Sequence, residues 1–453
     1  MQIDRSNPPK TDGVIEFHLP KFDKFVLNNG LEVVFVKKTN LPIIKMEMIV
    51  NAGSRLDLPN KSGLAYLTSL LIDEGAGKYN SLELDDEIES LGSIFSVSTD
   101  NDNIRLSMLS LMENVERSME LLSLVYQSPN FTEDDFKREQ KKLLSKIIQH
   151  QDEPSYVASS IFDKIIFENT HYQNSVIGNA NDVNSINNSD VINFHIKYFI
   201  PSNSKLVVVG NIEVDELKNL LNNFFLNLSD ISLDVSDTQN PKLQKSIFYF
   251  IHKDGAAQSE IRIGHISDTR SETDYFAKVI ANSILGGQFS SRLNLNLRED
   301  KGFTYGIHST FAYYENMGYF EISTSVNGKD TGAAIKEIKK EVAGLKTNIA
   351  DHEIEFTKSY LIKRFPAMFE TYSQIANHLS TLLKYTLQDN YFDSYIERIT
   401  NCKRDEIEAI AKDKIKTDEL VYLIVGDKDV VLPQLNEISD SEIIELDVEG
   451  NRI

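Results

Sequence analysis

The chain has 453 residues, of which 41% are hydrophobic and 25% are charged. This composition is typical of a soluble globular protein, and the length predicts two to four domains because one core seldom grows so large. Asp and Glu number 68 against 47 Lys and Arg, so the formal net charge is −21. Such a deficit of cations disfavours nucleic acid or an anionic membrane surface as the main partner.

The chain has one cysteine, Cys402. This excludes an intramolecular disulfide and a thiolate metal site. The N-terminal segment lacks the basic region and apolar run of a signal peptide, and no stretch approaches the roughly 18 apolar residues of a membrane span. As written, the sequence predicts a cytoplasmic protein; a periplasmic location is the alternative if a leader has been removed.

Strands and helices alternate along the first half of the chain. Apolar patterning and turn residues predict strands over 31–38, 43–53, 93–100, 103–111 and 204–212, and helices over 63–74, 81–91 and 113–127. Thr132 and Asp135 have the spacing of a capping box for a further helix, and Pro154 predicts its end. Strands grouped beside helices in this way predict an α+β fold, with helices packed on a largely antiparallel sheet.

The same pattern then repeats. Segments 246–253, 259–266 and 419–427 match three strands of the first half, and segment 274–287 matches 64–77. A shift of 210 residues places Gly287 on Gly77, Gly302 on Gly92 and Tyr305 on Phe95. We therefore predict two homologous domains, 1–228 and 246–453, joined by a polar linker over 229–245. Facing each other as half of a clamshell, they would border a cleft large enough for a peptide.

The sequence contains no recognisable metal or nucleophile motif. Of its nine histidines, no two are three or four residues apart, so a helical zinc site with ligands at i and i+4 is excluded. A G-x-S-x-G nucleophile elbow and a P-loop are also missing.

Arg298 and Tyr305 form the more informative pair. A glycine turn leads into a predicted helix through Arg298, and then into a predicted strand that carries Tyr305. One interpretation is structural: a cation suits a helix C-terminus, and the tyrosine packs. The other is that both face the cleft, where their donors would hold a peptide carbonyl or an oxyanion. Spacing alone favours the structural interpretation.

Several stretches together resemble a known family. They include "NNGLEVVFVKK", "AGSRLDLPNKSGLAYLTSLLIDEGAGKYNS" and "ILGGQFSSRLNLNLREDKGFTYGIHSTF". Their order and spacing, over about residues 23 to 428, resemble the pitrilysin/insulinase/mitochondrial-processing-peptidase family of inverted-motif zinc peptidases.

The resemblance implies that the metal site has been lost. In active members a helix carries H-x-x-E-H, whose histidines bind zinc and whose glutamate polarises the attacking water. Tyr66, Ser69 and Leu70 stand at those positions here, and the position of the further glutamate ligand falls at or next to Lys146. The resemblance therefore implies a chain without a cofactor of its own, inactive as a metallopeptidase by itself, with zinc expected only in a partner subunit.

Arg298 and Tyr305 match a family pair that binds the substrate backbone. In two-subunit bacterial members one subunit carries the metal motif and the other carries this pair. The resemblance thus implies a non-catalytic, substrate-binding subunit of a heterodimeric peptidase, whose partner is a metal-bearing homologue or, in a homodimer, a second copy. The alternatives are a purely structural assembly subunit and a stand-alone hydrolase that uses other residues.

Overall fold

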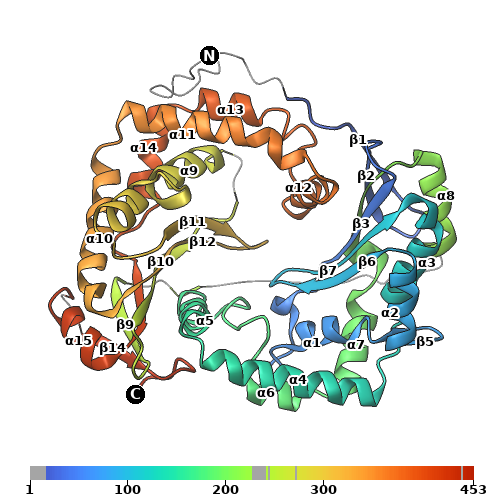
Figure 1. Ribbon diagram of the computed structural model, residues 1–453, viewed down its shortest axis with the longest axis horizontal. Helices are drawn as coiled ribbons and strands as arrows, with labels where there is room; N and C mark the ends of the chain where they lie inside the picture. The colour runs from blue at the N-terminus through green and yellow to red at the C-terminus, as the bar shows by residue number, and fades with distance from the viewer. Residues whose placement is uncertain (1–16, 227–240, 243–244, 271–272, 440–441) are drawn as a thin grey trace, which may run out of the picture.

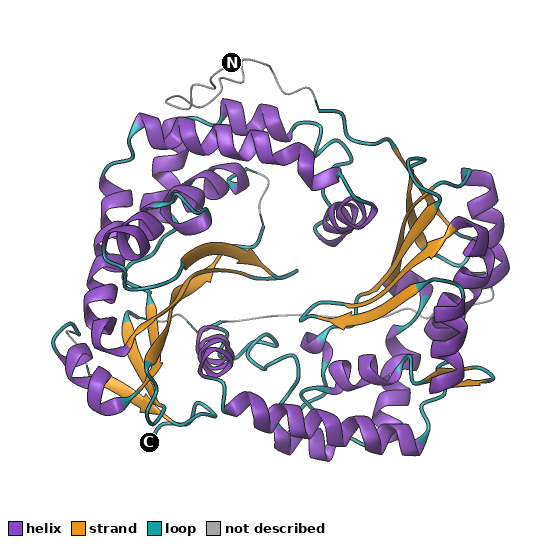
Figure 2. Ribbon diagram, in the orientation of Figure 1, coloured by secondary structure: helices purple, strands orange, loops and turns teal. Residues whose placement is uncertain are grey.

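Two six-stranded sheets organise the chain, one from each half. The computed structural model describes residues 17–226, 241–242, 245–270, 273–439 and 442–453. Most of the predicted linker, 229–245, lies outside these described residues. Figure 2 shows the sheets as separate groups of strands, with helices between them and around them.

The first sheet contains, in spatial order, β1 (Phe22–Val26), β2 (Glu32–Lys37), β8 (Ser204–Gly210), β3 (Ile43–Val50), β7 (Ile104–Leu111) and β6 (Ile94–Thr99). Only the β2–β8 pair in this sheet is parallel. The central strands β2, β3 and β8 are buried over nearly their whole length, which shows that both faces of these strands are covered. A two-stranded ribbon, β4 (Gly75–Ala76) and β5 (Tyr79–Asn80), lies outside this sheet.

The second sheet repeats this arrangement. Its order is β11 (Ile307–Tyr313), β12 (Gly318–Asn327), β10 (Gln258–Ser267), β13 (Val421–Gly426), β9 (Ile247–His252) and β14 (Ile443–Leu446). Read from β9 to β11, it matches the first sheet read from β2 to β6. The outermost strands differ, because β1 is antiparallel to β2 whereas β14 is parallel to β9. The predicted fold class, α+β with two similar and largely antiparallel sheets, is confirmed.

The helices of the first half are α1 (Leu64–Leu71), α2 (Ser81–Ser90), α3 (Val115–Gln127), α4 (Glu133–Gln151), α5 (Pro154–Ile166), α6 (Ala180–Ser185), α7 (Asn188–Tyr198) and α8 (Val214–Phe225). Thr132 caps α4 as predicted, because its hydroxyl accepts a hydrogen bond from the Asp135 backbone N–H at 3.2 Å. Helix α4 ends at Gln151, just before Pro154 as predicted, and Pro154 is the first residue of α5, where a proline loses no helical hydrogen bond.

The helices of the second half are α9 (Tyr275–Asn282), α10 (Thr331–Thr347), α11 (Asp351–Arg364), α12 (Tyr372–Lys384), α13 (Tyr395–Asn401), α14 (Arg404–Asp413) and α15 (Lys428–Asn436), with two π-helical segments, η4 (Ser283–Gly287) and η5 (Asn294–Asp300). Gly302 follows η5 with φ 66°, and its counterpart Gly92 has φ 61°. The predicted shift therefore pairs two left-handed turns that precede equivalent strands, β11 and β6.

One helix from each half packs on the sheet of the other half. In Figure 1, α5 and α12 lie between the two sheets. Helix α12 packs on β8 and β3 of the first sheet, whereas α5 packs on β10 and β13 of the second. Val157 and Ile161 of α5 share an apolar cluster with Val421 and Leu423 of β13. This exchange binds the two halves together, and local patterning along the chain did not predict it.

Within the part of the chain that the structure describes, none of the helices combines the length and the hydropathy needed to span a bilayer.

Candidate functional site

Helix α1 carries the positions at which the family resemblance places a metal motif. It begins after Gly63, which adopts a left-handed conformation with φ 95°. The Asp57 carboxylate accepts hydrogen bonds from the backbone N–H groups of Gly63 and Ala65, both at 2.7 Å. These bonds satisfy helix-start donors that have no partner within the helix. Burial raises the pKa of Asp57 to about 8 despite these bonds.

Tyr66 of α1 and Lys146 of α4 meet. The Lys146 Nζ donates to the Tyr66 hydroxyl at 2.8 Å and lies 5.1 Å from the centre of its ring. Helices α1 and α4 thus bring together two positions at which the family resemblance places metal ligands, although Tyr66 and Lys146 are 80 residues apart in sequence. The contact is a hydrogen bond combined with a cation–π interaction, which joins the helices without a metal.

Ser69 and Leu70 complete the substituted motif. The Ser69 hydroxyl is buried and donates to the Tyr66 carbonyl at 2.7 Å, while Leu70 packs against the first hydrophobic core. A tyrosine, an occupied serine hydroxyl, an aliphatic side chain and an ammonium do not provide ligands for zinc, which binds histidine, cysteine and carboxylate groups. Over the described ranges, no cluster of three such residues is arranged to hold a metal ion.

Helix α1 and its counterpart in the second half, α9, differ in the burial of two matched positions. The sequence shift aligns Tyr66 and Leu70 with Phe276 and Ile280 of α9, and predicts that both pairs are core. Phe276 and Ile280 are buried, but Tyr66 and Leu70 are only half-buried. For Tyr66 the reason is that its hydroxyl extends to the exposed Lys146 on α4.

Arg298 lies near the end of the π-helical segment η5. Its guanidinium carbon is 4.2 Å from the centre of the Phe289 ring, and the side chain keeps 33% of its surface exposed. The carboxylate paired with it is that of the neighbouring Glu299, at 3.7 Å, which is longer than a hydrogen bond. No hydrogen bond from this guanidinium is found among the described residues, so its donors are available to a ligand.

Tyr305 does not lie on a strand, contrary to the prediction. It lies in the loop before β11, which begins at Ile307, and 93% of its surface is exposed. A local turn sets this geometry: Thr304 donates to the Gly306 carbonyl at 2.8 Å and accepts from the Gly306 N–H at 3.0 Å. The turn directs the Tyr305 ring into solvent, so packing does not account for this tyrosine.

Asn294 is a site residue that sequence reasoning missed. Its buried amide donates to the Ile307 carbonyl at 2.8 Å and to the Gln288 carbonyl at 3.3 Å, and its oxygen accepts from the Ile307 N–H at 3.3 Å. One side chain thus joins the loop before η5, η5 itself and the start of β11. A single asparagine in a helix has no motif that would have indicated this role.

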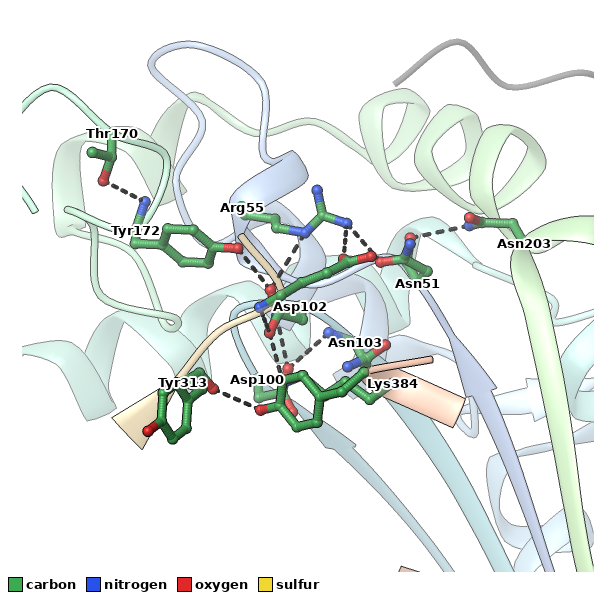
Figure 3. A network of polar contacts seen from close by, with 12 residues as sticks. Asn51, Arg55, Asp100, Asp102, Asn103, Thr170, Tyr172, Asn203, Tyr313 and Lys384 are labelled. Atoms are coloured by element: carbon green, nitrogen blue, oxygen red, sulfur yellow. Dashed lines mark hydrogen bonds and ion pairs between the residues drawn. The ribbon is translucent and has the colours of Figure 1, made fainter. Parts of the chain in front are cut away.

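A second missed feature is a polar network around Asp102, at the tip of the β6–β7 hairpin (Figure 3). The buried carboxylate accepts hydrogen bonds from the Tyr172 hydroxyl at 2.9 Å and the Glu315 N–H at 3.0 Å. It also pairs with the Lys384 Nζ at 2.6 Å and the Arg55 Nε at 3.5 Å. Because Glu315 and Lys384 belong to the second half, this carboxylate joins both halves of the chain.

Comparison with known proteins confirms the family resemblance. The family model described as "Insulinase (Peptidase family M16)" matches residues 32–180, and the one described as "Peptidase M16 inactive domain" matches residues 185–361. The fold and the substituted motif define a peptidase-like protein. The chain belongs to peptidase family M16.

Individual relatives are distant but cover most of the chain. The "Non-peptidase homolog YmxG" of Helicobacter pylori is 23% identical over 87% of this chain and 92% of its own length. Mitochondrial-processing peptidase subunit beta of Bos taurus is 20% identical over 77% of this chain and 72% of its own length. A crystal structure of a peptidase M16 inactive domain from Pseudomonas fluorescens has the same fold, with a TM-score of 0.85 at 23% identity over 90% of this chain and 98% of that one.

Proposed function

We propose that this chain is the non-catalytic, substrate-binding subunit of a heterodimeric zinc metallopeptidase that degrades or processes peptides. The observation that carries the proposal is a contrast between two sites. Tyr66 and Lys146 contact each other at the metal positions, whereas no hydrogen bond from the Arg298 guanidinium or the Tyr305 hydroxyl is found among the described residues. A pair with only a structural role would be packed or bonded within the chain.

In this proposal a homologous partner carries the H-x-x-E-H helix, and its zinc supplies the activated water. The residues of this chain bind and orient the peptide. Arg298 offers a planar fork of donors and Tyr305 one hydroxyl, which suits a peptide carbonyl as it gains negative charge. Tyr305 also precedes β11, the edge strand of the second sheet. A peptide that added to this edge as a further strand would pass directly beside Tyr305.

The names of two relatives are consistent with this division of labour. One is called a non-peptidase homolog and another is called subunit beta of a processing peptidase. Applied to this chain, they support a member that acts within an assembly and is no peptidase by itself.

The test combines the purified chain with an H-x-x-E-H homologue from the same genome and measures cleavage of an internally quenched peptide library. We expect cleavage by the mixture and none by this chain alone. Arg298→Ala is expected to lower kcat/KM by about 10²–10³, the usual loss for one oxyanion donor. Arg364→Ala is the matched control, because Arg364 is an exposed arginine at the end of α11 whose Nη1 donates to Tyr360. Equal rates for wild type and Arg298→Ala would overturn the proposal.

If this chain forms a stable complex that cleaves no peptide, whichever metal-bearing homologue is added, the result would instead favour a structural assembly subunit.

A further inference from the structure

Arg298 packs against an aromatic ring, and its ion pair with Glu299 is too long for a hydrogen bond. Its guanidinium carbon lies 4.2 Å from the centre of the Phe289 ring, well inside the range of a cation–π contact. The adjacent Glu299 is 3.7 Å away, too far for a hydrogen bond. Stacking uses the flat face of a guanidinium and leaves the donors along its edge available. The ring therefore restrains Arg298 without consuming the groups that would bind a ligand.

Phe289 has no evident role in the core. It keeps 65% of its surface exposed, although exposing a ring of this size to water is unfavourable. The backbone position of Phe289 is nevertheless fixed, because the preceding residue, Gln288, is held by hydrogen bonds. The Gln288 carbonyl accepts from the Ser291 N–H at 3.1 Å and from the Asn294 amide at 3.3 Å, and the Gln288 amide reaches Thr357 of α11 at 3.2 Å.

The same asparagine fixes the opposite side of the site. Asn294 bonds both the carbonyl and the N–H of Ile307, two residues after Tyr305. The Phe289 loop, the helix of Arg298 and the strand after Tyr305 therefore share one buried anchor. A mobile arginine would lose side-chain entropy on binding. A stacked arginine has already lost part of it.

We propose that Phe289 is a positioning residue, which stacks on Arg298 and holds its guanidinium edge toward the peptide backbone. This inference rests on the proposed function, since the peptide is the ligand that Arg298 receives. It assigns to an exposed aromatic side chain a role that acts entirely through its neighbour.

The experiment uses the complex with the metal-bearing homologue and the same quenched peptide library. Phe289→Ala is expected to lower kcat/KM by about two- to fivefold, the effect of losing one exposed cation–π contact. Phe289→Trp should retain wild-type activity because it keeps the aromatic face. Phe289→Leu should resemble Phe289→Ala because it keeps only apolar bulk. Phe356→Ala is the matched control: Phe356 is another exposed phenylalanine, and no cation–π contact to it is found in the described part of the chain.

A double-mutant cycle decides whether Phe289 acts through Arg298. In the Arg298→Ala background, Phe289→Ala should cause no further loss. If Phe289→Ala has no effect, or lowers activity equally in both backgrounds, this inference is wrong while the proposed function stands. If Arg298→Ala itself has no effect, the proposed function fails together with the inference.

Discussion

Lys384, the last residue of α12, places its Nζ 2.6 Å from the Asp102 carboxylate at the tip of the β6–β7 hairpin. Burial by itself lowers the pKa of Lys384, but attraction to Asp102 and Asp100 outweighs this effect and raises the pKa above its ordinary value. The pair joins a helix of the second half to a hairpin of the first. Together with α5 and α12, it fixes how the two sheets face each other.

We expect Asp102→Ala to lower the free energy of unfolding by about 3–5 kcal/mol, because it removes the buried carboxylate that pairs with Lys384 and Arg55. Urea denaturation followed by circular dichroism measures this loss. Asp351→Ala is the control: its carboxylate pairs with Arg404 on the surface, and such pairs contribute at most about 1 kcal/mol. Similar small losses for both variants would show that the Asp102 network does not hold the halves together.

Asp163 on α5 predicts a pH dependence of stability. Burial, followed by repulsion from Glu321, raises its pKa to about 8, although Arg262 acts in the opposite direction. The folded state therefore binds this proton more tightly than the unfolded state, whose pKa is near 3.8. The contribution of Asp163 to the free energy of unfolding is therefore greatest below about pH 4. It decreases as the pH rises toward 8 and is constant above that.

Asp163→Asn isolates this effect, because an amide mimics the protonated acid at every pH. Between pH 5 and 8 the wild type should lose about 1–3 kcal/mol of unfolding free energy relative to Asp163→Asn. Parallel stability curves for the two proteins would contradict the raised pKa.

Restoring the ligands tests whether the α1 and α4 positions still have the geometry of a metal site. We expect the variant with Tyr66→His, Ser69→Glu, Leu70→His and Lys146→Glu to bind zinc, because the Tyr66–Lys146 contact already brings α1 and α4 within reach of each other. Isothermal titration calorimetry against the wild type measures the binding. A folded variant without zinc affinity would mean that the helices have drifted from ligating geometry.

Tyr305 should affect binding but not stability. Because 93% of its surface is exposed, Tyr305→Phe is expected to change the free energy of unfolding by less than about 0.5 kcal/mol. The same change should raise KM or lower kcat of the assembled complex toward peptides, since the hydroxyl is lost. A thermal melt and a cleavage assay on one preparation separate the two effects, and unchanged kinetics would exclude a role for the hydroxyl.

Asn294→Ala, unlike Tyr305→Phe, should reduce both the free energy of unfolding and peptide cleavage. It leaves the Ile307 carbonyl and N–H without this partner near the start of β11, and each buried polar group left unsatisfied costs about 1–3 kcal/mol. Loss of stability without any loss of peptide cleavage would show that the anchor does not set the site.

Much of the fold followed from local patterns. The predicted strands over 31–38 and 43–53 correspond to β2 and β3, and the repeat predicted two similar sheets. The site was only partly predictable. Arg298 and Tyr305 were found by their resemblance to a family pair, yet the loop position of Tyr305 depends on a turn made by Thr304 and Gly306.

The sequence by itself determined that Tyr66, Ser69 and Leu70 stand where the family resemblance places two histidines and a glutamate, because residue type and spacing are enough to establish this. Only the tertiary structure decided that Tyr66 contacts Lys146, which ring packs on Arg298, and how Asp102 joins the halves. The physical reason is that these contacts link residues on different elements, and the path of the chain brings them together where no local periodicity records it.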